Sequence, residues 1–390
     1  MIEDVSLLFN KFFQSEKASG FVLIFCMLIS IILANTAFSD SYISFWNLHI
    51  GSDANGLHLD HSIVHWINDG LMTIFFLLVG LEIERELYIG ELHPIKNAIL
   101  PVGAAIGGML IPALIYLSLN INTSMASGFG IPMGTDIAFA LAILSLAGSR
   151  VPVAIKILLT AIAIIDDLGA ILIIALFYGN EIHLVFLAAS IGIFALLLLL
   201  NRMNVNTLWL YLIPGIVMWY CMMESGIHPT IAGVLLAFAI PFRDGSAKSP
   251  SYILQHFLHR PVAFIVLPLF VLANTAIPIK TEFLNSLTGS HAIGIGLGLF
   301  FGKPMGILIA CWLLFKMKIV SMPANVKWNH LLGMGCMAGI GFTMSIFITK
   351  LAFDDEVHIQ SSKMMILIAS LCAGLVGYLI LGMKKRSNQN

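Results

Sequence analysis

The chain has 390 residues, of which 59% are hydrophobic and only 11% are charged. Soluble domains carry about 25% charged residues, so a globule of this composition could not cover its surface with polar groups. The net charge of −1 at pH 7 excludes the basic surface on which nucleic-acid binding depends. The five cysteines lack the spacing of a zinc site or of a disulfide framework. The composition therefore predicts a protein that the lipid bilayer covers over much of its surface.

Apolar segments long enough to cross a bilayer follow one another along the whole chain. A spanning helix needs about 20 mainly apolar residues. The N-terminus carries Glu3 and Asp4, which is not the basic start of a cleavable signal peptide. We therefore expect an all-α polytopic membrane protein, a single domain over 1–390, with twelve transmembrane helices. The predicted spans are 19–36, 63–83, 97–119, 124–146, 151–177, 182–200, 206–221, 225–240, 254–274, 291–314, 328–349 and 363–383.

Lysine and arginine predict the orientation, because these residues are enriched in cytoplasmic loops. Nearly all of them fall on one side of the predicted spans, together with both termini. Lys280, Lys350 and Lys363 fall on the other side, and Lys303 lies inside a span. Both termini are therefore predicted to be cytoplasmic.

The one long external loop, 37–62, contains no lysine or arginine. Polar and apolar residues alternate over Trp46–Ile50 and again over Leu57–Leu59, on either side of a turn-rich stretch. This pattern predicts a small β-hairpin within 44–60. An exposed hairpin edge can pair with a second copy of the chain, although an ordered external cap explains the pattern equally well.

Two predicted spans contain runs of glycine that weaken a helix. The first run is Gly128–Asp136, which also contains a proline, and the second is Gly333–Thr343. Unwound backbone at membrane depth is tolerated only inside protein or beside a water-filled cavity. The alternative is that these glycines serve close helix packing.

Each interrupted span is the middle one of three, within 95–177 and within 290–383. Under the predicted topology the two triplets enter the membrane from opposite sides. That arrangement is the inverted repeat of secondary transporters.

Four ionisable residues are predicted to lie at membrane depth, where a charge is costly and usually functional. Asp166 and Asp167 are adjacent, and their side chains point about 100° apart on a helix. Two carboxylates this close cannot both be ionised cheaply in a low dielectric. A carboxylate can hold a proton or a hard cation, and competition between those ligands is the chemistry of antiport. The alternative is a structural polar cluster.

The other two are Lys303 and Asp136. Lys303 can pair with a carboxylate, with Asp166 the first choice, or face the negative ends of the interrupted helices. Its alternative is snorkelling to the surface. Asp136 can balance the positive helix ends, and Thr135 beside it can bond backbone that the break leaves free.

Weaker candidates, for a pH response, lie at the predicted cytoplasmic ends of two predicted spans. One set is Glu82, Arg85 and Glu86, for which a solvated helix end with local ion pairs is the alternative. The other set is His256 and His259. Histidine as a residue type can act as a sensor near neutral pH, and the alternative is an interfacial pair.

Six short motifs together resemble the NhaA family of bacterial sodium/proton antiporters. They lie in the same order over nearly the whole chain, and the set is far more specific than any one motif. The motifs are Gly80–Leu87, Gly134–Ala140, Ile165–Gly169, Ser225–His228, Leu267–Asn274 and Phe300–Pro304.

The resemblance implies twelve spans, with interrupted helices 4 and 11 crossing at mid-membrane. It implies that sodium or lithium and protons bind at Asp166 and Asp167, that Lys303 is the partner of Asp166, and that Lys303 and Asp136 balance the helix ends. It further implies electrogenic, pH-regulated exchange without a cofactor, in the bacterial inner membrane, by a homodimer joined through the external hairpin.

One position departs from the family pattern. Gln255 stands where the family has an acidic residue before the first histidine, His256, which puts the pH response in doubt and leaves the transport site intact.

Three other functions remain open. A sodium-coupled symporter of a small organic substrate would share the broken helices. An intramembrane aspartyl protease would need its two aspartates on facing helices, whereas Asp166 and Asp167 are sequence neighbours. A passive channel would carry sodium without moving protons. The few ionisable residues at membrane depth are mostly acidic, which favours a transporter of bare cations and not an enzyme.

Overall fold

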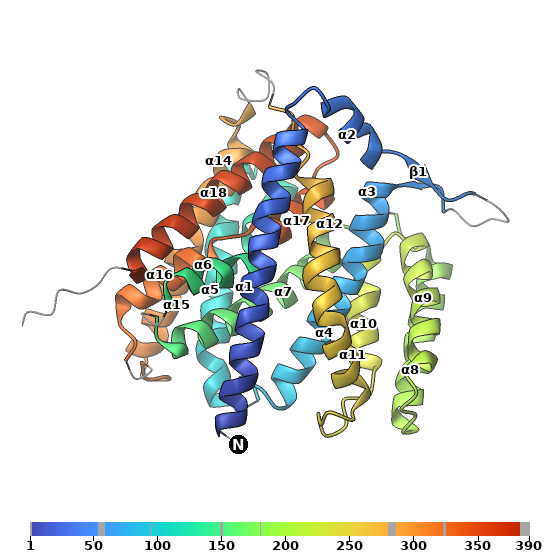
Figure 1. Ribbon diagram of the computed structural model, residues 1–390, viewed down its shortest axis with the longest axis horizontal. Coiled ribbons are helices and arrows are strands. Elements are labelled where there is room, and N and C mark those ends of the chain that lie inside the picture. The colour runs from blue at the N-terminus through green and yellow to red at the C-terminus, as the bar shows by residue number, and fades with distance from the viewer. Residues whose placement is uncertain are drawn as a thin grey trace, which may run out of the picture. The chain divides into compact units, whose positions relative to one another are not determined.

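The computed structural model describes residues 2–53, 59–93, 95–148, 151–179, 181–279, 286–322 and 325–382. Over these residues nearly all regular structure is helical (Figure 1). Seven helices are long and apolar enough to cross a membrane, and up to nine if each of two bent pairs is one span. This confirms a polytopic helical membrane protein. The total of twelve spans stays a prediction, because shorter apolar helices such as Thr230–Ala239 fall below the length of an unaided span.

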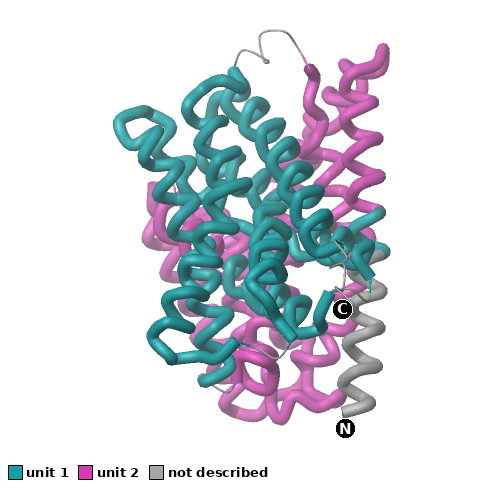
Figure 2. The backbone as a smooth tube through the Cα atoms, turned by 90° about the vertical axis from the view of Figure 1, so that its left-hand side faces the viewer, with its two compact units in different colours: residues 1–21, 95–167, 281–390 teal, residues 22–94, 168–280 magenta. Residues whose placement is uncertain are grey.

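The chain divides into two compact units, coloured separately in Figure 2. Unit 1 comprises residues 1–21, 95–167 and 281–390, and unit 2 comprises residues 22–94 and 168–280. Helices α1 (Ile2–Leu33) and α7 (Val153–Phe177) contribute to both. The inverted relation of the two predicted repeats stays a prediction.

Unit 1 holds the two bent helix pairs and the helices packed around them. Besides its parts of α1 and α7, it contains α5 (Ile95–Asn120), η2 (Ala126–Met133), α6 (Ile137–Leu146), α14 (Ser290–Leu297), η5 (Gly298–Gly302), α15 (Lys303–Lys316), α16 (Trp328–Ala338), α17 (Phe342–Ala352) and α18 (Glu356–Gly382).

Unit 2 holds the strand pair and the remaining helices. They are α2 (Ser39–Trp46), β1 (His49–Ile50), β2 (His61–Ser62), α3 (Ile63–His65), η1 (Trp66–Leu71), α4 (Met72–Tyr88), α8 (Leu184–Arg202), α9 (Trp209–Glu224), α10 (Thr230–Ala239), α11 (Pro250–Pro261), η4 (Val262–Val266) and α12 (Leu267–Asn274).

Both glycine-rich stretches predicted to be interrupted are bent at a break. Helix η2 meets α6 at 41°, and α16 meets α17 at 45°. The first break lies at residues 134–136 and the second at residues 339–341. The glycines also serve close packing, which was the alternative, because a Cβ atom on Gly335 would lie 2.9 Å from the Cα of Pro304.

Close packing of α5 against α15 fixes the backbone that carries Lys303. A Cβ atom on Gly306 would lie 2.0 Å from the carbonyl oxygen of Gly107, and one on Gly302 would lie 2.9 Å from the Cα of Pro112. Only residues without a side chain allow the two backbones to approach this closely.

Helix α8 presents large apolar side chains away from the protein. Val185 is 80% exposed and Leu184 is 75% exposed. Exposed apolar surface of this kind marks contact with a membrane or with another protein, which agrees with the composition.

The predicted hairpin within 44–60 is not confirmed. A short antiparallel pair does form, with His49 opposite Ser62 and Ile50 opposite His61. The first predicted strand begins too early, because Trp46 ends helix α2. Of the second predicted strand, Leu57 and His58 lie outside the described residues, and Leu59 belongs to no strand.

Candidate functional site

The two breaks of unit 1 contact each other directly. The backbone N–H of Asp136 donates to the carbonyl oxygen of Ile340 at 2.7 Å, and the Thr135 hydroxyl donates to the carbonyl oxygen of Ala338 at 2.9 Å. Ala338 is the last residue of α16, and carbonyls at a helix end have no partner within their own helix. One backbone N–H and one side-chain hydroxyl of the first break therefore satisfy two carbonyls at the second break.

The Asp136 carboxylate caps two helices at once. Its Oδ1 accepts the backbone N–H of Phe139 at 2.9 Å, in the first turn of α6. Its Oδ2 accepts the backbone N–H of Thr343 at 3.2 Å and the Thr343 hydroxyl at 2.6 Å, in the first turn of α17. An anion at a helix N-terminus is stabilised by the partial positive charge there. One buried carboxylate thus serves both helices that begin at the breaks.

Asp166, Lys303 and Thr135 form a buried triangle. The Lys303 ammonium donates to Asp166 Oδ2 and to the Thr135 hydroxyl oxygen. The Thr135 hydroxyl lies 2.7 Å from the same carboxylate oxygen. Lys303 and Asp166 are 0% and 1% exposed, so Lys303 does not snorkel to the surface. Thr135 therefore links this charge pair to the contact between the two breaks.

The neighbouring carboxylate of Asp167 is also buried, at 2% exposed. The second oxygen of Asp166, Oδ1, is buried and accepts no hydrogen bond from the residues that the structure describes. When ionised, Asp166, Asp167 and Lys303 together carry one more negative charge than positive charge, and a net buried charge is costly. A proton or a small cation bound by the carboxylates would balance it.

No group of three or more His, Cys, Asp or Glu side chains within the described ranges is arranged to hold a metal ion. The two adjacent carboxylates, Asp166 and Asp167, stay the predicted ligands for a small cation.

Thr343 was missed in the sequence, although a signal was available. It follows the break at Gly341 by two residues, just as Thr135 and Asp136 follow Gly134. A hydroxyl residue beside a break is a candidate to bond the backbone or a capping carboxylate there.

We expect Thr343→Val to destabilise the protein by about 1–3 kcal/mol, because it removes a hydrogen bond to a buried carboxylate that keeps its other partners. Thr343→Ser retains the hydroxyl and should restore most of the loss. Thermal unfolding of the purified variants measures both effects. Equal stability of wild type and Thr343→Val would contradict this assignment.

Among the five candidates for a pH response, one contact joins two different helices. His259 Nδ1 on α11 lies 3.9 Å from Glu82 Oε1 on α4. Glu86 instead accepts the backbone N–H of Glu91 at 2.9 Å, and His256 stacks on Tyr252 with ring centroids 6.0 Å apart.

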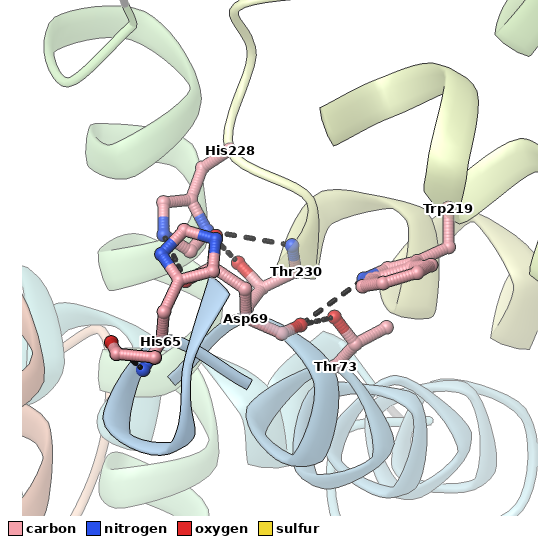
Figure 3. A network of polar contacts seen from close by, with 7 residues as sticks. His65, Asp69, Thr73, Trp219, His228 and Thr230 are labelled. Carbon is pink, nitrogen blue, oxygen red and sulfur yellow. Dashed lines mark hydrogen bonds and ion pairs between the residues drawn. The ribbon is translucent and has the colours of Figure 1, made fainter. Parts of the chain in front are cut away.

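A second polar network, drawn in Figure 3, surrounds Asp69 in unit 2. Its carboxylate lies between two imidazoles, 3.5 Å from His65 Nε2 and 3.9 Å from His228 Nε2. Its backbone carbonyl accepts hydrogen bonds from the Trp219 indole, at 3.1 Å, and from the Thr73 hydroxyl. Asp69 and His228 lie far apart in the sequence, and the fold brings them together.

Burial lowers the pKa of His228, which lies in the link between α9 and α10; Asp69 opposes this effect and His65 reinforces it. The folded protein therefore binds this proton more weakly than the unfolded chain. Neutral His228 therefore contributes its full stability above the pKa of the unfolded chain, about 6.5. This contribution is lost as the pH falls through the lower pKa of the folded protein.

Accordingly, His228→Gln should make the stability less dependent on pH below about 6.5, since glutamine binds no proton. Melting temperatures measured from neutral to acid pH test this. The exposed His93→Gln serves as the matched control. Parallel losses of stability in wild type and His228→Gln would contradict the assignment.

These features define a polytopic helical membrane protein with a buried charged site where two interrupted helices meet. The family model described as Na+/H+ antiporter 1 matches residues 10–381. The chain belongs to this family, which confirms the family predicted from its motifs.

Curated relatives resemble the chain over almost its full length. One from Flavobacterium psychrophilum, named Na(+)/H(+) antiporter NhaA, is 54% identical over 95% of this chain and 94% of its own. One from Flavobacterium johnsoniae, named Na(+)/H(+) antiporter NhaA 1, is 54% identical over 98% of each chain. A Clostridium beijerinckii relative of the same name is 46% identical over 98% of this chain and 96% of its own.

Proposed function

We propose that this protein is an electrogenic sodium/proton antiporter that also accepts lithium and exports the cation in exchange for protons. Family membership and the names of its relatives support the reaction. The observation that carries the mechanism is the pair of buried carboxylates, Asp166 and Asp167, beside Lys303 at the crossing of the breaks. Sodium and protons compete for this pair, so binding of one releases the other.

Alternating access follows from the same geometry. At the breaks the hydrogen bonds of a continuous helix are missing. Thr135 donates instead to the carbonyl at the end of α16, and Asp136 accepts hydrogen bonds at the starts of α6 and α17. Such a contact can change its arrangement without breaking a helix, because its hydrogen bonds join the two breaks and lie outside the regular hydrogen bonds of either helix. A site exposed to one side at a time then carries sodium one way and protons the other.

The remaining expectations are part of the same proposal. The protein lies in the bacterial inner membrane with both termini in the cytoplasm, and it serves sodium and pH homeostasis. Glu82, Arg85, Glu86, His256 and His259 set its pH response; the contact between Glu82 and His259 supports a role for those two. A homodimer forms through the external 44–60 segment, and no cofactor takes part.

The test uses inside-out vesicles from cells that lack their own antiporters. Respiration acidifies the lumen, and a pH-sensitive dye reports the gradient while sodium, lithium or potassium is added from about pH 6.5 to about pH 8.5, around the range of histidine titration. We expect sodium and lithium to discharge the gradient and potassium to leave it intact. Discharge by none of the three cations would contradict antiport and favour sodium-coupled uptake of an organic substrate.

Two further conditions separate antiport from other routes. In a passive channel, sodium moves without any proton movement, so labelled sodium would enter while the dye stays unchanged. Electrogenic exchange should speed up when potassium and valinomycin set a membrane potential in the favoured direction, because net charge crosses the membrane in each cycle.

A further inference from the structure

Glu84 on α4 is a buried carboxyl group that the proposed mechanism does not use. It is 5% exposed, and its Oε2 has no hydrogen-bond partner among the described residues. Its neighbours Glu82, Arg85 and Glu86 are in the predicted pH-responsive set, and Glu84 is not. A buried polar atom without a partner is uncommon in a native fold and calls for a physical explanation.

Contacts of two other residues on α4 indicate which face of the helix carries Glu84. Four residues before it, Gly80 packs so closely against α10 that a Cβ atom there would lie 2.6 Å from that of Ala237. Four residues after it, Tyr88 stacks on Phe242 with ring centroids 5.0 Å apart. Residues at this spacing share one face of a helix. Glu84 therefore lies on the face of α4 that packs on α10, opposite its C-terminal end at Ala239.

The C-terminal end of α10 disfavours a carboxylate beside it. The carbonyls at a helix C-terminus give it a partial negative charge. The Asn201 side chain donates to one of them, the carbonyl oxygen of Ala239, at 3.0 Å, and α10 carries no ionisable side chain that could offset the charge. A neutral carboxylic acid has the opposite property, because its O–H can donate to such carbonyls. The site thus accommodates the protonated form of Glu84 better than the anion.

Charged groups on the other elements packed against α4 are placed elsewhere. On α11, His259 lies beside Glu82, while η4 has no ionisable side chain. Arg85 on α4 is adjacent to Glu84 and points about 100° away. The remaining titratable or charged side chains are Asp69 of η1, in the network of Figure 3, Tyr252, His256 and Arg260 of α11, and Arg243 and Asp244 after α10.

We propose that Glu84 is a second proton-binding site of this protein, distinct from Asp166 and Asp167. It holds a proton while α4 and α10 are packed together. It releases that proton only when the C-terminal end of this helix interface opens to water. The inference extends the proposed pH response, on which its physiological meaning rests, to a residue outside the predicted set.

Infrared difference spectroscopy on the purified full-length protein tests the proton directly, without sodium and without transport. Spectra at about pH 6 and about pH 9, on either side of neutral, should contain a carbonyl band of a protonated carboxylic acid. Glu84→Gln should remove one such band. The control Glu91→Gln, at an exposed position just after α4, should not. An unchanged set of protonated-acid bands in Glu84→Gln would overturn the proposal.

Thermal unfolding gives a second, independent readout. Glutamine is neutral at every pH, whereas an unfolded glutamate ionises above about pH 4.3. The melting temperature of Glu84→Gln should therefore exceed that of wild type by more at about pH 9 than at about pH 6. Glu84→Leu, which fills the same space without a polar group, provides the test if the glutamine variant does not fold. A melting difference independent of pH in both variants would overturn the proposal. Failure of antiport in vesicles would leave either result unchanged.

Discussion

Asp167→Asn is expected to abolish sodium-dependent proton movement in inside-out vesicles. Asparagine has nearly the same shape as aspartate, but it cannot lose a proton or carry the negative charge that binds a cation. Loss of a charged, buried interaction costs on the order of 3 kcal/mol, which lowers sodium affinity about a hundredfold. The carboxylate that remains, Asp166, is paired with Lys303, so added sodium or lithium should not discharge the gradient.

A matched change outside the site separates loss of the ligand from general damage. Asp354→Asn is the same substitution at an exposed position of unit 1, and it should exchange like wild type. Quantifying each variant in the membrane accounts for differences in expression. Wild-type exchange by a correctly inserted Asp167→Asn variant would exclude Asp167 from the ion site.

Lys303→Met is expected to produce the largest loss of stability among single changes in unit 1. It leaves Asp166 as an uncompensated buried charge, and breaking a buried ion pair from one side costs about 3–5 kcal/mol. Asp166 can escape part of this cost by taking up a proton. The fall in melting temperature should therefore be larger at alkaline than at acid pH, as a pH series of thermal unfolding would reveal.

The double variant Lys303→Met, Asp166→Asn separates stability from transport. Removing both charges removes the unpaired ion, and replacement of a whole buried pair is often neutral or stabilising. The double variant should therefore regain most of the stability lost by Lys303→Met and should still not exchange sodium for protons. Additive losses of stability from the two changes would mean that Lys303 and Asp166 do not interact in the folded protein.

The chemistry-bearing residues of unit 1 could be selected from the sequence because ionisable side chains at membrane depth are few. Asp136, Asp166, Asp167 and Lys303 stand out in apolar segments for that reason alone. Glycine content likewise predicted where the spans 124–146 and 328–349 would break. Their functional roles stay predictions until exchange is measured.

Contacts between distant parts of the chain could not be predicted. The hydrogen bond from Thr135 to Ala338 joins residues 203 positions apart, and that from Thr343 to Asp136 joins residues 207 positions apart. No local pattern specifies such a pairing, which depends on how the two breaks meet. Glu84 was overlooked because its neighbours suggest a solvated helix end, whereas the packing of α4 against α10 buries it.

Proton release on cation binding tests the central claim, that sodium and protons compete for the two carboxylates. Sodium, lithium or potassium is added to purified wild-type protein in weakly buffered detergent solution, and the change in pH is recorded. We predict that sodium and lithium release protons and potassium does not, and that the Asp166→Asn, Asp167→Asn double variant releases none. Sodium binding to wild type without proton release, or equal release from the double variant, would contradict the account.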